Sequence, residues 1–104
     1  MPYAVCLMRL TKEGKKAIKD FPKRLEAAKK AILASGGKLV EIYATLGRYD
    51  FVAVVEMSTL ENAMGTSALI SSTGTVKIET LVGFNEAEWK KILGKLRLDV
   101  IIQG

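Results

Sequence analysis

The spacing of the apolar residues switches repeatedly between two periods along the chain, and the order of these switches constrains the fold more than any other feature. A period of two, typical of a β-strand, runs from Tyr3 to Leu10. Steps of three and four, typical of a helix, then connect the apolar residues between Ile18 and Ile32. The same two periods predict further strands at residues 38–46, 51–57 and 75–84, and a second helical region at 58–73.

Capping and helix-breaking residues indicate where the first helical region begins and ends. Thr11 is expected to cap a short first helix. Pro22 should end that helix near Asp20 and occupy the first turn of a second helix, where its missing N–H costs little. Asp20 is the candidate cap of this second helix, and the pair Gly36 and Gly37 is expected to stop it.

The later helices carry the sequence pattern of a capping box. Ser58 is followed by Glu61, and Asn85 is followed by Glu88, each at the three-residue spacing that lets the two side chains cap one helix end. The first pair predicts the start of the helix at 58–73, and the second predicts a C-terminal helix. A last alternating segment predicts an extra strand at residues 96–102.

The predicted order is βαββαβ, followed by a helix and a strand, and this order predicts an α+β fold of the ferredoxin-like type. Two strands separated by so short a turn must form an antiparallel hairpin. Right-handed crossovers then place both helices on one face of a four-stranded antiparallel sheet. The length of 104 residues fits one domain, so residues 1–104 are expected to form a single ferredoxin-like domain with 96–102 as an additional strand.

The sheet face turned away from the helices is predicted to be too apolar to lie in water. Strict alternation assigns to the helix side Ala4, Cys6, Met8, Leu10, Val40, Ile42, Ala44 and Leu46. It assigns to the other side Tyr3, Val5, Leu7, Arg9, Leu39, Glu41, Tyr43, Thr45, Val52, Val54, Glu56, Lys77, Glu79 and Leu81. Because burial stabilises by about 25 cal/mol per Å² of apolar area, we expect a second copy of the chain to cover this side, sheet against sheet. The predicted partner is therefore the chain itself, as a homodimer or a higher oligomer.

The composition excludes several classes of chemistry. The chain has no histidine, which excludes Ser-His triads and the usual zinc sites. Cys6 is the single cysteine, so no intramolecular disulfide can form, which fits a reducing cytoplasm. No apolar run approaches the roughly 20 residues that span a bilayer, so a cytoplasmic protein without membrane contact is expected. No residue spacing predicts a metal, and no cofactor is expected.

The positive charge is concentrated in the first helical region. Residues 1–38 contain ten Lys and Arg against three Asp and Glu, whereas residues 39–104 contain six against eight. A nucleic-acid-binding surface would need aromatic or base-contacting groups beside these lysines, and few are present. A solvated helix surface is the better interpretation, and nucleic acid is not the expected partner.

The ionisable residues of the second sheet face form the preferred candidate site. Glu41, Tyr43 and Glu56 are the candidate catalytic residues, because carboxylates buried between two sheets can do acid–base chemistry. The candidate ligand-binding residues are Arg9, Lys77 and Glu79 from the same face, together with Tyr49 and Asp50 from the hairpin turn. The simpler alternatives are an interfacial ion-pair network for the face and ordinary turn chemistry for Gly47 to Asp50.

Several segments are similar to the GYD domain family, which is named for a Gly-Tyr-Asp signature in the turn after the second strand. The matching segments are Thr11 to Gly14, Pro22 to Lys29, Gly36-Gly37, Tyr43, Leu46 to Phe51, Glu56 and Glu79 to Leu81, so the resemblance covers residues 1–90. It implies membership of the dimeric α+β barrel group. It implies no particular reaction, and the 96–102 strand is not part of the family pattern.

Three hypotheses for function follow. The leading one is an oligomeric module that binds a small organic molecule in a pocket at the sheet interface. The second is a small enzyme, such as an isomerase or an oxygenase-like protein, in which Glu41, Tyr43 and Glu56 carry out acid–base chemistry. The third is a structural or regulatory assembly without a ligand.

Overall fold

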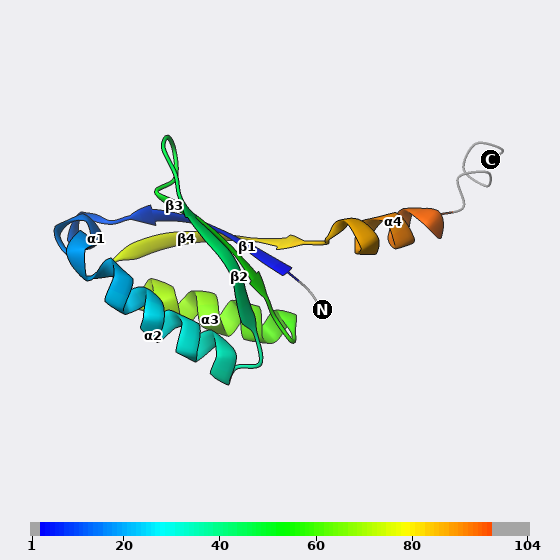
Figure 1. The fold of residues 1–104 in the computed structure, drawn as a ribbon, viewed down its shortest axis with the longest axis horizontal. Coiled ribbons are helices and arrows are strands. Elements are labelled where there is room, and N and C mark those ends of the chain that lie inside the picture. The colour runs from blue at the N-terminus through cyan, green and yellow to red at the C-terminus, as the bar shows by residue number, and fades with distance from the viewer. Residues whose placement is uncertain (1–2, 97–104) are drawn as a thin grey trace.

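A computed structural model describes residues 3–96 of the chain, and Figure 1 shows its fold. Helices and strands alternate in the predicted βαββαβ order, with an additional helix at the end. The elements are β1 (Tyr3–Leu10), α1 (Lys12–Lys16), the 3-10 helix η1 (Ile18–Asp20), α2 (Phe21–Ala34), β2 (Lys38–Ala44), β3 (Phe51–Glu56), α3 (Leu60–Ser72), β4 (Val76–Gly83) and α4 (Glu86–Gly94). The predicted strand at 96–102 lies, apart from Leu96, outside the described residues, and Leu96 is not part of a strand.

The four strands form one antiparallel sheet in the order β2-β3-β1-β4. The predicted α+β class and the four-stranded antiparallel sheet are therefore confirmed, and the strand order agrees with a ferredoxin-like arrangement. The long helices α2 and α3 lie side by side on one side of the sheet (Figure 1). No helix among residues 3–96 is long and apolar enough to cross a membrane.

The β2 strand departs from strict alternation and corrects the predicted faces. Leu39 pairs with Val55 and Glu41 pairs with Val54, so Val40 is an extra residue in a β-bulge. The bulge turns Leu39 toward the helices, where it packs against the core, and leaves Val40 49% exposed. The prediction was therefore wrong for Leu39, which lies on the helix side, and for Val40, which is the extra residue of the bulge and does not reach the core. Leu46 lies beyond the end of the strand and is fully exposed, also contrary to the prediction.

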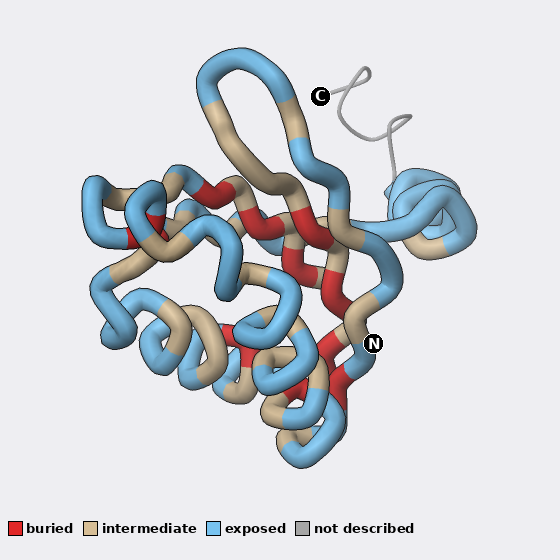
Figure 2. Tube along the Cα trace, turned by 60° about the vertical axis from the view of Figure 1, so that its left-hand side comes forward, coloured by how far each residue is buried: buried red, intermediate tan, exposed pale blue. Residues whose placement is uncertain are grey.

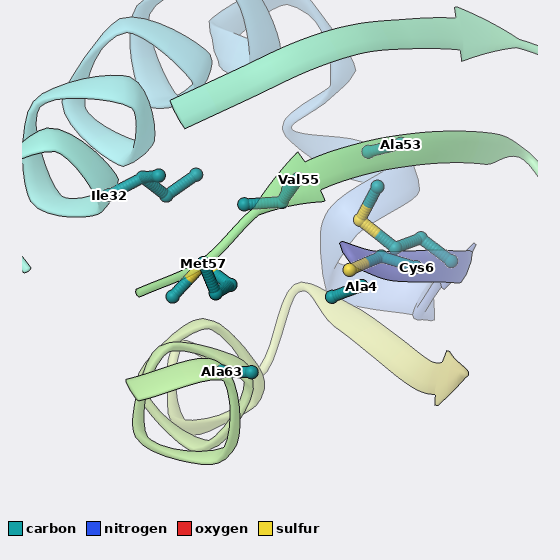
Figure 3. Close-up of a cluster of buried hydrophobic side chains, with 8 residues drawn as sticks. Ala4, Cys6, Ile32, Ala53, Val55, Met57 and Ala63 are labelled. Carbon is teal, nitrogen blue, oxygen red and sulfur yellow. The ribbon is translucent and has the colours of Figure 1, made fainter. Parts of the chain in front are cut away.

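The core lies between the sheet and the two long helices, and it is built mainly from small side chains and methionines. Figure 2 shows the buried stretches concentrated in the sheet, and Figure 3 shows how side chains from β1, β3, α2 and α3 meet. The cluster consists of Ala4, Cys6, Met8, Ile32, Ala53, Val55, Met57 and Ala63. The small side chains let the backbones approach closely. At Gly14, a Cβ atom would collide with the carbonyl oxygen of Thr75.

The observed caps confirm two predictions and correct two. Thr11 caps α1 by accepting a hydrogen bond from the backbone N–H of Gly14, 3.1 Å away. Asn85 and Glu88 form the predicted capping box of α4. The cap of α3 is Thr59 rather than Ser58, and its hydroxyl accepts from the N–H of Asn62. Asp20 occupies the cap position of α2, but its side chain makes no capping hydrogen bond.

The helix α4 stands apart from the rest of the fold. It continues outward from the end of β4, away from α2 and α3 (Figure 1). No strand or helix among residues 3–96 packs extensively against it. A long hydrogen bond, from Asn85 Nδ2 to Tyr3 Oη at 3.4 Å, ties the capping residue of α4 to β1. The apolar side of α4 is therefore left without an intramolecular partner in the described part of the chain.

Candidate functional site

The sheet side opposite α2 and α3, here called the open face, is the first candidate site. Within residues 3–96 no helix covers it (Figure 1). Its centre is an apolar strip that runs across three strands, because the register places Val5 opposite both Val54 and Leu81 and places Leu7 opposite Val52. None of these five side chains is buried, and Leu81 is 47% exposed. Such a contiguous apolar strip on a sheet is typical of an interaction surface.

The three predicted catalytic residues lie on this open face but in three different cross-strand rows. Glu56 is paired with Lys38 and Tyr3, Glu41 is paired with Val54, and Tyr43 is paired with Val52. No hydrogen bond connects the three side chains with one another, and the Glu41 carboxylate instead accepts from the N–H of Ile42 at 3.1 Å. Tyr43 is 58% exposed. Within one chain, these residues border the apolar strip and do not converge on a common point.

Three of the predicted ligand-binding residues do converge at one end of the open face. Tyr49 Oη donates a hydrogen bond to Glu79 Oε2 at 2.9 Å. The Arg9 guanidinium carbon lies 5.3 Å from the centre of the Tyr49 ring, within the range of a cation–π contact. Lys77 is paired with Arg9 across the strands and adds a second positive charge. The hairpin turn therefore places the Tyr49 ring beside positively and negatively charged side chains of the sheet.

Asp50 has a different position and a structural contact. Its carboxylate oxygen Oδ2 accepts a 2.7 Å hydrogen bond from the N–H of Leu10, and its own N–H donates to the carbonyl oxygen of Met8 at 2.8 Å. The residue thus fastens the hairpin turn to the end of β1. Gly47 permits this turn because its φ of +106° is unfavourable for other residues. A ligand-binding role for Asp50 stays a prediction.

The electrostatic features of the described chain give little support for a metal or a reactive thiol. No group of three or more Cys, Asp or Glu side chains within residues 3–96 is arranged to hold a metal ion. Cys6 is buried on the helix side, as predicted, and burial raises the pKa of its thiol, while a hydrogen bond with Thr80 partly opposes this change. A raised pKa keeps the thiol neutral and unreactive near neutral pH.

A second candidate site lies on the other side of the sheet, and the sequence patterns did not reveal it. A cavity of about 320 Å³ separates α2 and α3 from the strands, and its lining is almost entirely apolar. None of the eight predicted site residues lines this cavity. The signal in the sequence is a series of small residues on α2, because Ala27, Ala28 and Ala31 face the cavity and leave it unfilled.

The apolar side of α4 is a third unpartnered surface. Ile92 and Leu93 lie three and four residues after Trp89, so these three side chains form one stripe along the helix, and Leu96 follows shortly after its end. Each of these side chains is more than 40% exposed. No described part of the same chain packs extensively against this stripe.

Comparison with known proteins places this fold and its hairpin signature in a family. Residues 5–93 match the GYD domain, which is most of the chain. The chain belongs to the GYD domain family. The match includes the hairpin turn with Gly47, Tyr49 and Asp50, and the cross-strand partners of the open face.

Two matches from Thermus thermophilus resemble this chain over most of its length. A protein named glutamine synthetase and cystathionine beta-lyase binding protein is 33% identical over 82 residues, which cover 78% of this chain and 86% of the relative. The crystal structure of TTHA0845 superimposes with a TM-score of 0.53 at 28% identity, and the match covers 82% of this chain and 95% of that chain. The similarity therefore extends over nearly the whole length of both relatives.

Proposed function

We propose that this GYD domain chain is a protein-binding module that works as a dimer closed by its open faces. The observation that carries the proposal is the uncovered apolar strip of Val5, Leu7, Val52, Val54 and Leu81. Leaving this strip in water forgoes about 25 cal/mol for each Å² of apolar area that a partner would bury. A second copy supplies a matching apolar strip, and sheets pack well face to face at about 10 Å separation.

The charges around the strip suit a two-fold contact between identical surfaces. Lys38 and Arg9 lie on the same face as Glu41, Glu56 and Glu79, so both signs border the apolar centre. In a two-fold dimer each position can face a different position of the partner, which lets positive groups meet negative ones. The stripe on α4 points to the same arrangement, because a helix that extends away from its own fold is free to cover a second copy.

The proposed binding partner of the dimer is an enzyme subunit. The relative that is 33% identical carries a name stating that it binds glutamine synthetase and cystathionine beta-lyase. In a dimer closed by the open faces, α1, η1 and α2 remain outside, and their exposed lysines include Lys15, Lys19 and Lys23. We assign the enzyme contact to this basic surface, which is complementary to an acidic patch on a partner and speeds its association.

The dimer is tested by light scattering on a matched pair of variants. Val5→Lys places a charge at the centre of the apolar strip, between Val54 and Leu81. Leu33→Lys makes the same kind of change at an exposed residue of α2, on the opposite side of the sheet from the strip. We expect the wild-type chain and Leu33→Lys to have the mass of a dimer, and Val5→Lys to have the mass of a monomer with an unchanged circular dichroism spectrum. A wild-type chain that is monomeric at the same concentration would refute the proposal.

Enzyme binding is tested separately with purified proteins. The glutamine synthetase and the cystathionine beta-lyase of the organism that encodes this chain are immobilised, and binding is followed by interferometry. We expect saturable binding that weakens with salt, and at least tenfold weaker binding by the triple variant Lys15→Glu, Lys19→Glu, Lys23→Glu. A triple variant that binds as well as the wild-type chain would exclude the basic surface. Failure of both enzymes to bind would leave the dimer standing and remove this class of partner.

A small organic ligand at the rim of the sheet interface is the second candidate function. The specific observation that favours it is the cluster of Arg9, Tyr49 and Glu79, which offers a charge, an aromatic ring and a carboxylate at one end of the open face. The enzyme hypothesis requires more, because Glu41, Tyr43 and Glu56 would have to meet residues of a second copy to converge. Under both hypotheses the purified dimer can retain a ligand, and native mass spectrometry would detect it as added mass. A wild-type dimer without added mass would argue against a ligand, and so would an added mass that the Arg9→Met dimer retains in full.

A further inference from the structure

The cavity between the sheet and the helices is larger than a well-packed core of this size would leave. Protein interiors are packed as densely as organic crystals, with few voids larger than one water molecule. The volume of about 320 Å³ instead lies at the lower end of the range of small-molecule sites, roughly 300–1,000 Å³. Apolar walls around such a volume favour occupation by an apolar molecule.

The lining divides into an apolar interior and a mouth. Interior walls come from Met8, Ile32 and Val55, which are buried, and the neutral thiol of Cys6 belongs to the same wall. The exposed members of the lining lie on the two helices, as Ala27 on α2 and Leu69 on α3 do, or directly after α3, as Thr73 does. The cavity therefore opens to solvent between α2 and α3, on the opposite side of the sheet from the open face.

Two polar side chains of the lining have no partner within residues 3–96. Arg24 belongs to α2, is exposed and makes no hydrogen bond or ion pair with another described residue, although Glu26 on the same helix pairs with Lys29. Thr66 on α3 is half-buried, and its hydroxyl likewise has no side-chain hydrogen bond in the described part of the chain. No acidic side chain lines the cavity. A guanidinium and a hydroxyl at an otherwise apolar cavity are complementary to one carboxylate.

We propose that this cavity binds a small carboxylic acid with an apolar body, such as a medium-chain fatty acid. The hydrocarbon body occupies the space beneath α2 and α3, and the carboxylate accepts hydrogen bonds from Arg24 and Thr66 at the mouth. This site is separate from the open face, so its test does not depend on whether the proposed dimer forms. A flexible alkyl chain suits the cavity because its walls offer apolar contact in every direction and only its mouth offers a charge.

Titration with decanoate, followed by methyl NMR of the full-length chain, tests the position of the ligand. We expect saturable shifts of methyl groups that line the cavity and unchanged methyl groups on the open face. The cavity reporters are Leu25, Ile32, Ile42, Ile70 and Ile78, and the open-face reporters are Val5, Leu7, Val52, Val54 and Leu81. Shifts confined to the open-face reporters would overturn the proposal, and so would no shifts at millimolar decanoate.

Variants of Arg24 test the chemical class of the ligand. Arg24→Met retains an unbranched aliphatic stem but removes the charged guanidinium. We therefore expect about tenfold weaker binding of decanoate and unchanged binding of 1-decanol. Arg48→Met, in the hairpin turn and outside the cavity, is the matched control and should bind decanoate like the wild-type chain. Equal loss of decanoate and decanol binding, or no loss for either, would overturn the assignment of a carboxylate to Arg24.

A cavity-filling variant gives a second line of evidence. Ala28→Leu adds three carbon atoms to the lining on α2, and we expect it to abolish decanoate binding while raising the melting temperature. Decanoate that still shifts the cavity reporters of a folded Ala28→Leu variant with wild-type affinity would contradict the location. Because Arg24 is exposed, the Arg24→Met test remains decisive even where the filled variant does not fold.

Discussion

Tyr49 and Asp50 are neighbours in the chain, yet their side chains serve opposite parts of the structure. The phenol reaches across to Glu79 on the open face, whereas the carboxylate accepts from the backbone of Leu10. The GYD signature therefore combines one residue that is available for recognition with one that fixes the turn.

Replacing Asp50 tests this division at the level of one residue. Asp50→Ala leaves the half-buried N–H of Leu10 without its partner, which should lower the free energy of unfolding by about 1–3 kcal/mol. Asp50→Asn retains an acceptor oxygen at the same place and should lose clearly less. Urea denaturation followed by circular dichroism measures both changes. Equal losses for the two variants would show that the hydrogen bond to Leu10 is not what the carboxylate contributes.

Cys6 predicts how stability depends on alkaline pH. Burial raises the pKa of its thiol in the folded chain above the ordinary value near 9.0, so the unfolded chain loses this proton first as pH rises. The unfolded state is then favoured, and the contribution of the neutral thiol is complete below pH 9.0 and declines above it. We expect the free energy of unfolding to fall more steeply above that pH for the wild-type chain than for Cys6→Ala. Parallel pH profiles would contradict this expectation.

At the scale of elements, sequence periodicity predicted the type and order of the helices and strands from β1 to α4, because both periods are long and regular here. It failed at β2, where the bulge at Val40 turns Leu39 to the helix side and leaves Val40 exposed. A bulge is chosen by how two strands fit together, and alternation within one strand carries no record of it. The cap at Thr59 was also missed, because Ser58 and Thr59 are both good caps and the sequence does not distinguish them.

The candidate sites were predictable to different degrees. The open face followed from alternation, since its apolar and ionisable residues occupy every second position of three strands. The meeting of Tyr49 with Glu79, 30 residues further along the chain, required the register of β1 and β4 as well. The cavity was not predicted, because the alanines of α2 indicate only small side chains, and the unfilled volume also depends on how far α2 and α3 stand from the sheet.

The α4 helix provides a reporter of its own environment, because Trp89 is the single tryptophan of the chain. Trp89 is 43% exposed and lies on the apolar stripe with Ile92. If the stripe covers a second copy, the emission of Trp89 should shift to shorter wavelength as the protein concentration rises. Fluorescence spectra over a dilution series measure the shift, and Ile92→Ser should weaken it. Emission that does not change with concentration would show that α4 takes no part in association.

At the scale of the whole molecule, the two sides of the sheet differ in kind. The helix side is closed by α2 and α3 around a small core and contains the apolar cavity. The open face carries the apolar strip with charges at its border, and no helix within residues 3–96 covers it. A small domain buries a modest share of its surface on folding. The apolar area of the open face is therefore a large part of the area whose burial could stabilise this domain further.

Folding and association of this chain are therefore expected to be coupled. For a dimer that unfolds to separate chains, each tenfold rise in protein concentration should stabilise the folded state by about 1.4 kcal/mol per mole of dimer. Thermal unfolding over a hundredfold range of concentration should consequently show a rising midpoint for the wild-type chain and for Leu33→Lys. Val5→Lys removes the contact between the strips, so its midpoint should be lower and independent of concentration. A wild-type midpoint that stays constant over this range would mean that the chain completes its fold alone, with the strip of Val5 and Leu81 exposed to water.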